Sequence, residues 1–442
     1  MVVGAGAIAA LLAGYAGTHD YFEAAAFVVR AAGMKGVARS FADLEAEPVT
    51  ETEITIPWRG GQLRGRRYVP ADVSGRPILL VPGVHAAGIA EPRLINFARE
   101  IAATGHPVTT AELPDLAKYQ ITPRTTDMIE DAATWLGHPG PGAPAPDQKP
   151  GLLGISFAGG LSVVAASRMG DRAAWVLSFG GHGDFPRALR YLCTGVLPNG
   201  QTRPPHDYGV VIILLGVADK LVPAEQVDPL RQGILAFLNA SHLDMVDKPR
   251  AALEFERARK LSETLPEPAR TFMSWVNNRD VARLGPALLP HVAELGADPA
   301  LSAARNPPPS APVYLLHGAD DNVIPAVESA LLAEDLRSRG ARVTQLSTPL
   351  ITHAEVDHPP EIAEIWRLVH FWAGPLQSEG LLFPSGGFRP PDRAAPSLAR
   401  PLCPAPLRRG ARLARLSLGT GAGFPLHLES DHGTLRAGCV RR

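Results

Sequence analysis

Short apolar runs alternate with amphipathic segments from about residue 50 to residue 373. Apolar runs bounded by Pro and Gly are typical of buried strands, whereas apolar residues three and four apart are typical of helices. This alternation predicts an α/β fold with a doubly wound, mostly parallel eight-stranded sheet. The predicted strands are 52–57, 62–69, 77–82, 106–111, the run ending at Ile155, 173–179, 312–317 and 342–347, and the predicted helices are 92–104, 125–136, 326–338 and 360–372. The first two strands flank Arg59-Gly60-Gly61, which predicts a hairpin.

The alternation stops between residues 186 and 310. This stretch has a mainly helical pattern, with helices predicted over 251–261 and 269–275, and it closes with three consecutive prolines at 307–309. Because the strand pattern resumes after it, we interpret the stretch as a helical lid inserted after the sixth strand.

The chain therefore divides into five predicted segments. They are an N-terminal apolar helical segment over 1–49, the first part of the α/β core over 50–185, the lid over 186–310, the second part of the core over 311–373, and a tail over 374–442. The tail is rich in Pro, Gly and Arg, has no Lys and shows little periodicity, which predicts disorder.

The first 17 residues are apolar and small, so export or membrane association through residues 1–17 has to be weighed. No Lys or Arg precedes the apolar run, and the run is shorter than the roughly 20 residues of a membrane span. A helix that packs on the domain and continues over 21–30 is therefore favoured, and with it a cytoplasmic location.

Composition narrows the classes of function. The chain has 43 basic and 44 acidic side chains and a net charge of −1, which gives no argument for nucleic acid or an anionic membrane as partner. Its three cysteines, Cys193, Cys403 and Cys439, have no C-x-x-C spacing, so neither a disulfide framework nor a cysteine zinc site is indicated. The sequence has no P-loop, no G-x-G-x-x-G after a strand and no H-E-x-x-H, so no metal and no cofactor is expected.

Ser156 interrupts an apolar run between small residues. The sequence Gly154-Ile-Ser-Phe-Ala158 is followed by Gly159 and Gly160, so the backbone has room for a sharp turn from a strand into a helix. Such a turn holds a serine hydroxyl clear of the sheet, where it can act as a nucleophile. Ala158 stands where the G-x-S-x-G motif has its second glycine.

This turn resembles the nucleophile elbow of the α/β-hydrolase superfamily, and two later motifs point to the same family. The sequence H-G-A-D-D-N-V-I-P, beginning at His317 after the seventh predicted strand, is similar to the family's acid loop, G-x-x-D-x-x-hydrophobic-Pro, and places the acid at Asp321. His353 follows the eighth predicted strand, where the family's histidine loop lies. The resemblance covers residues 50–373 and implies an α/β-hydrolase fold with a Ser156, Asp321, His353 triad.

The acid and the base have alternatives. Asp320 could supply the acid instead of its neighbour, and the sequence G-V-A-D-K-L-V-P around Asp219 fits the same acid-loop pattern. Asp219 lies inside the insertion, however, and the apolar run 210–215 before it also fits a buried helix. His358 competes as the base, but it directly precedes two prolines, which favours a place at a helix entry.

The oxyanion of a serine hydrolase needs backbone N–H donors. The resemblance assigns one donor to Phe157, which follows the nucleophile, and the other to the loop after the third strand, with Val84 preferred over His85. His85 and His182 each follow a predicted strand and are candidates to line the pocket, although a surface position or a structural hydrogen bond is favoured for both.

The resemblance implies a serine hydrolase that cleaves a carboxylic ester, or a thioester, of a small-molecule substrate through an acyl-enzyme. Two alternatives use the same fold: an acyltransferase or perhydrolase with the same triad, and a hydrolase-fold binding protein without turnover. The apolar stretch 233–238 fits the insertion's own helix packing better than an acyl-chain site. Acyl-chain preference is therefore not predicted.

Overall fold

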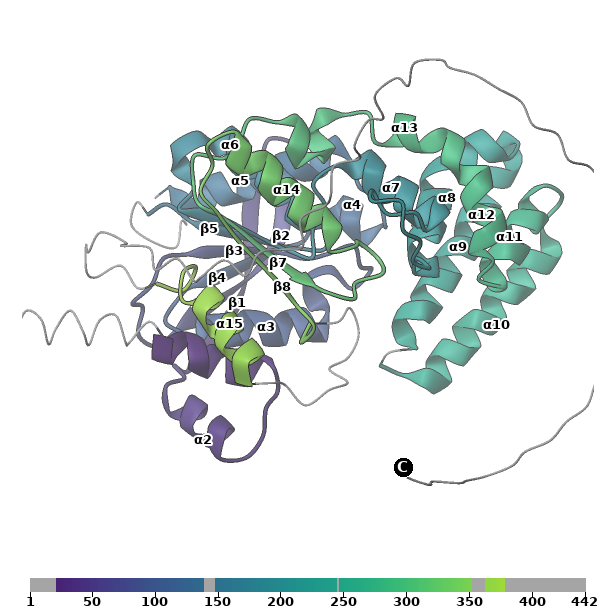
Figure 1. Ribbon diagram of the computed structural model, residues 1–442. Helices are drawn as coiled ribbons and strands as arrows, with labels where there is room; N and C mark the ends of the chain where they lie inside the picture. The colour runs from purple at the N-terminus through teal and green to yellow at the C-terminus, as the bar shows by residue number, and fades with distance from the viewer. Residues whose placement is uncertain (1–20, 139–147, 245, 352–361, 378–442) are drawn as a thin grey trace, which may run out of the picture. The chain divides into compact units, whose positions relative to one another are not determined.

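The apolar runs of the sequence form the strands of one sheet in the computed structural model (Figure 1), which describes residues 21–138, 148–244, 246–351 and 362–377. Within these residues the sheet has eight strands in the order β1-β2-β4-β3-β5-β6-β7-β8. The strands are β1 Val49–Trp58, β2 Gly61–Pro70, β3 Ile78–Val81, β4 Val108–Ala111, β5 Gly151–Ile155, β6 Trp175–Phe179, β7 Val313–Gly318 and β8 Val343–Thr348. β2 is antiparallel to both of its neighbours, β1 and β4, and each remaining pair of neighbours is parallel.

Successive residues of the central strands face two different cores. In β3, Ile78 and Leu80 pack on one side of the sheet and Leu79 and Val81 on the other, as the alternation of side chains along a strand requires. Helices cover both sides, which explains why these strands are apolar throughout. The first side carries α3 Pro92–Ala102 and α15 Ile362–Trp372, and the second carries α5 Pro123–Gly137, α6 Phe157–Met169 and α14 Val327–Ser338 (Figure 1). The predicted doubly wound, mostly parallel sheet is confirmed.

The predicted hairpin closes where Trp58 pairs with Gly61 across the two-residue loop Arg59-Gly60. The sequence pattern does not predict two short helices, α2 Val37–Leu44 and α4 Pro114–Ala117. α4 is a single turn and is too short to show a helical period.

Between β6 and β7 the described chain is helical rather than extended. Its α-helices are α7 Phe185–Thr194, α8 Asp207–Leu221, α9 Ala224–Leu243, α10 Lys248–Thr264, α11 Ala269–Asn277, α12 Val281–Leu288 and α13 Val292–Leu295. Apolar side chains of α7, α8, α9 and α12 belong to the same buried cluster as the second side of the sheet. The helical insertion is thus packed on the core through shared hydrophobic contacts, whereas its role as a lid stays a prediction.

The N-terminal helix over 21–31 packs on the first side of the sheet. Phe27 is buried, and its ring centroid lies 4.8 Å from that of Trp372 in α15. Arg30 is also buried, where it forms a 2.9 Å ion pair with Glu100 of α3. These contacts agree with the expected packed helix over 21–30.

Several predictions concern residues that the structure does not describe. Residues 1–17 and the predicted tail from residue 378 onward lie outside the described residues, so their assignments stay predictions. Among the described residues, no helix is both long enough and apolar enough to span a bilayer.

Candidate active site

Ser156 occupies a sharp turn between β5 and α6. Its backbone angles are φ 57° and ψ −133°, a combination that side-chain-bearing residues rarely adopt and that costs on the order of 1–3 kcal/mol. Two hydrogen bonds hold the turn: the Ser156 N–H donates to the Phe179 carbonyl at 2.7 Å, and the Ser156 carbonyl accepts from the Gly159 N–H at 2.8 Å. The predicted change from strand to helix at this serine is therefore present, and it is strained.

Glycines on both sides let the turn form. A Cβ atom on Gly154 would lie 2.4 Å from the Ala158 carbonyl oxygen and 2.4 Å from Ser162 Oγ, so any side chain there would force β5 and α6 apart. A Cβ atom on Gly83, in the loop after β3, would lie 3.3 Å from the Cβ atom of Ser156. The loop after β3 therefore approaches the candidate nucleophile directly.

Replacing Ser156 by Gly should stabilise the fold relative to Ser156→Ala. Glycine adopts positive φ without the steric cost that alanine retains, so we expect the free energy of unfolding of the Gly variant to exceed that of the Ala variant by about 1 kcal/mol. Urea denaturation of both variants measures the difference. If the Ala variant were equally or more stable, the backbone strain at this position would be refuted.

Two candidate oxyanion donors lie beside this turn. Phe157 is the first residue of α6, so its N–H is one of the unpaired donors at the positive end of the helix dipole. Val84 follows Gly83, which adjoins Ser156. Within the described part of the chain, neither the Phe157 N–H nor the Val84 N–H donates to a protein acceptor. Both groups therefore stay candidate donors to a negatively charged oxygen.

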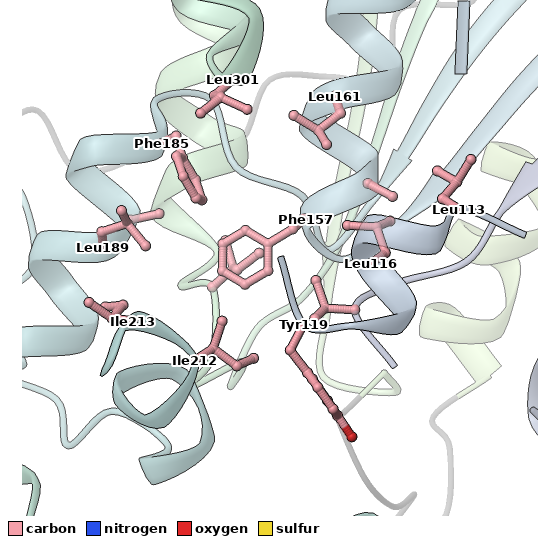
Figure 2. Close-up of a cluster of buried hydrophobic side chains, with 14 of the residues drawn as sticks. Leu113, Leu116, Tyr119, Phe157, Leu161, Phe185, Leu189, Ile212, Ile213 and Leu301 are labelled. Atoms are coloured by element: carbon pink, nitrogen blue, oxygen red, sulfur yellow. The ribbon is translucent and has the colours of Figure 1, made fainter. Parts of the chain in front are cut away.

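The Phe157 side chain is buried where the core meets the helical insertion (Figure 2). Its ring lies among Leu116 from the core side and Leu189 and Ile212 from α7 and α8. Tyr119 is beside it, with the hydroxyl directed away from the phenyl ring. Side chains from both parts of the chain therefore fix the start of α6.

Asp321 is buried at the end of β7, and its carboxylate is anchored by the backbone. Oδ1 accepts hydrogen bonds from the N–H groups of Val323 at 2.8 Å and Ile324 at 3.0 Å. Oδ2 lies 3.5 Å from His317 Nε2 and would lie 3.6 Å from a Cβ atom on Gly180. The anchored oxygen leaves the orientation of the carboxylate fixed.

Asp321 and Ser156 stand at the ends of strands on either side of β6. The end of β6 contacts both residues. The Phe179 carbonyl accepts a hydrogen bond from the Ser156 N–H, and the next residue, Gly180, adjoins the Asp321 carboxylate. The structure thus brings the predicted acid and the predicted nucleophile to one edge of the sheet, where ligands bind in open α/β sheets.

The alternative acids have different surroundings. The Asp320 side chain is 75% exposed and pairs with Arg203 at 3.6 Å. Asp219 lies in α8, as the buried-helix interpretation of residues 210–215 requires, and pairs with Arg231 at 3.4 Å. Among the described residues, neither carboxylate accepts hydrogen bonds from backbone N–H groups as that of Asp321 does.

His353, its alternative His358 and the rest of residues 352–361 lie outside the described residues. His353 therefore stays a prediction that rests on chain order after β8.

His182 is fully buried behind α6. Its Nε2 donates to the Leu301 carbonyl at 2.8 Å, and its ring packs against Phe157 and Phe185. Burial lowers the pKa of His182 from its ordinary value, so the ring is neutral. These contacts agree with the structural hydrogen bond favoured for it.

His85 contacts the helical insertion through a second histidine, His242 of α9. Its Nδ1 accepts the Ala87 N–H at 3.1 Å, so Nε2 carries the proton and donates to His242 Nδ1 at 2.5 Å. Burial, together with the neighbouring His242, lowers the pKa of His85 to about 4. A neutral His85 is therefore part of the folded loop.

This buried neutral histidine should make the protein less stable in acid. Unfolded His85 takes up a proton below pH 6.5, whereas folded His85 takes one up only near pH 4, so the free energy of unfolding should fall by at most about 3 kcal/mol across this window. His85→Gln should lose less stability than the wild type between pH 7 and pH 4.5 in urea titrations. His138→Gln, at an exposed histidine, should behave like the wild type, and an undiminished loss in His85→Gln would contradict the assignment.

Tyr208 and His242 are two residues near the site that the sequence does not reveal. The Tyr208 hydroxyl donates to the Val84 carbonyl at 3.1 Å, across 124 positions of sequence, and the contact of His85 with His242 spans 157. No motif or periodicity encodes such distant pairs.

Comparisons with known proteins give structural likeness only. No protein-family model matches the chain, and no curated protein matches it in sequence. An esterase from Pyrobaculum calidifontis shares 16% identity over 81% of this chain and 91% of its own, with a TM-score of 0.42. Carboxyl esterase 2 from Tuber melanosporum shares 13% identity over 74% of this chain and 85% of its own, also at 0.42.

A third similar structure is an acylaminoacyl peptidase from Pyrococcus horikoshii. It shares 14% identity over 79% of this chain and 45% of its own, with a TM-score of 0.42. Because identity and TM-score are low in all three cases, we base the chemistry on the residues of this chain.

Proposed function

We propose that this chain is a serine hydrolase of the α/β-hydrolase superfamily that cleaves a carboxylic ester or a thioester through an acyl-enzyme. The observation that carries the proposal is the strained Ser156, with φ 57° and ψ −133°, between a buried strand and the start of a helix. Strained backbone of this kind clusters at active sites.

The surrounding groups fit the steps of acyl transfer. Ser156 Oγ attacks the substrate carbonyl, and His353 accepts the hydroxyl proton as the Oγ–C bond forms. The bond from the carbonyl carbon to the leaving oxygen or sulfur then breaks, and His353 returns the proton to the leaving group. Asp321, buried and anchored by two backbone N–H groups, orients the imidazole and stabilises its cation.

The negative charge of the tetrahedral intermediate falls on the former carbonyl oxygen. The N–H groups of Phe157 and Val84 supply two donors without protein acceptors in the described chain, and the positive end of α6 adds to their field. Water then attacks the acyl-enzyme by the same sequence of proton transfers. The mechanism needs neither metal nor cofactor.

A fluorophosphonate probe tests the proposal on the full chain. We expect the probe to modify Ser156, located by peptide mapping, and to abolish turnover of p-nitrophenyl esters of short acyl chains. His353→Ala should react more than about a hundredfold more slowly, and His358→Ala should react like the wild type. A folded protein that neither reacts with the probe nor turns over esters of any acyl length would refute a hydrolase and favour a binding protein.

A further inference from the structure

The loop after β3 is held by two side chains of the helical insertion. Tyr208 of α8 donates its hydroxyl to the Val84 carbonyl at 3.1 Å, and His242 of α9 accepts from His85 Nε2 at 2.5 Å. Val84 and His85 are the two candidates for the second oxyanion donor. The insertion therefore contacts the backbone carbonyl of one candidate, Val84, and the side chain of the other, His85.

The Tyr208 contact is a well-defined one. The Tyr208 N–H donates to His206 Nδ1 at 3.2 Å, which fixes the residue at the start of α8. Its ring packs edge-on against Tyr119, with ring centroids 6.0 Å apart. Because burial raises the pKa of Tyr208 well above its usual value, the hydroxyl keeps its proton and acts as a donor to the carbonyl.

This hydrogen bond fixes which way the carbonyl between Val84 and His85 faces. The Val84 N–H, the preferred oxyanion donor, belongs to the preceding peptide, which meets this one at the Cα atom of Val84. In a trans peptide the C=O and the N–H point in opposite directions. A carbonyl bound to Tyr208 faces the insertion and cannot turn toward Ser156, where its lone pairs would repel the oxyanion. Such a turn would rotate the peptide about the bonds at the Cα atoms of Val84 and His85, and the hydrogen bond from Tyr208 restrains that rotation directly.

We infer that Tyr208 is a positioning residue: it holds the loop after β3 in the orientation that stabilises the oxyanion, with His242 as a second hold on the same loop. The inference rests on the proposed function. It makes the helical insertion part of the oxyanion site, so any motion of the insertion away from the core would also release the loop.

A pair of matched substrates isolates this effect. In a thionoester the carbonyl oxygen is replaced by sulfur, a weak hydrogen-bond acceptor, so hydrolysis gains little from an oxyanion site. We expect Tyr208→Phe to lower kcat for an oxygen ester about tenfold, with KM within about twofold of the wild type, since loss of a direct donor costs 10²–10³-fold. The kcat for the thionoester should fall less than about threefold, so the ratio of the oxygen-ester kcat to the thionoester kcat should fall.

The controls separate positioning from general damage. Tyr314→Phe removes a largely buried hydroxyl on β7, on the other side of the sheet, and should leave the ratio unchanged. If Tyr208→Phe does not fold, as judged by circular dichroism, His242→Ala serves as the test instead. The same ratio of kcat values should fall in that variant. Suppose that the wild type turns over esters. If the variant then loses the same factor of kcat on both substrates, or loses none, this inference alone is overturned. A wild type without ester turnover would overturn the proposed function and this inference with it.

Discussion

Ser156→Ala is expected to reduce kcat for ester hydrolysis by about 10⁶-fold, the loss typical of removing the nucleophile of a serine triad. The variant lacks the only atom that can form the acyl bond, while its oxyanion donors and substrate contacts remain. KM should therefore change little. Stopped-flow and steady-state rates with a p-nitrophenyl ester, on protein whose fold is verified by circular dichroism, measure the effect.

Ser162→Ala is the matched control for this experiment. Ser162 lies in α6 and is fully buried, and its Oγ approaches the elbow at Gly154, so the substitution removes a second hydroxyl from the same region. Its kcat should stay within a few-fold of the wild type. Turnover by Ser156→Ala close to the wild-type rate would sink the assignment of the nucleophile.

The arrangement of the sheet could be predicted because it is encoded locally. The strand Ile78-Leu79-Leu80-Val81 is apolar throughout, because its successive side chains pack alternately into the two cores on either side of the sheet. The change from strand to helix at Ser156 could be predicted as well, because small residues on both sides of it signal a tight turn. Where the local sequence and the tertiary environment favour the same structure, the sequence pattern is sufficient to predict it.

The contacts that complete the site could not be predicted. Tyr208 contacts Val84 and His85 contacts His242 only because the insertion folds back on the core. Neither contact changes the local pattern of hydrophobic and polar residues. The choice between Asp320 and Asp321 is a similar case, because adjacent acidic residues look alike in sequence. The fold separates them, with one side chain 75% exposed and the other anchored and buried.

Asp321→Asn is expected to reduce kcat by about 10⁴-fold, since an amide in place of the orienting carboxylate no longer stabilises the imidazolium and favours the wrong tautomer. The Asn carbonyl can still accept the N–H groups of Val323 and Ile324, which bind Oδ1 in the wild type, so the fold should persist. Steady-state rates across pH 6 to 9 measure the loss together with any shift of the profile.

Asp320→Asn is the control that the sequence itself offers, because it makes the same chemical change one residue away. Its side chain is exposed and pairs only with Arg203 among the described residues, and surface ion pairs contribute little to stability. Its kcat should remain within about twofold of the wild type, as should that of Asp219→Asn in α8. If Asp320→Asn lost most of its kcat while Asp321→Asn stayed active, the catalytic carboxylate would be that of the exposed residue. Anchoring by backbone N–H groups would then not identify the catalytic carboxylate in this loop.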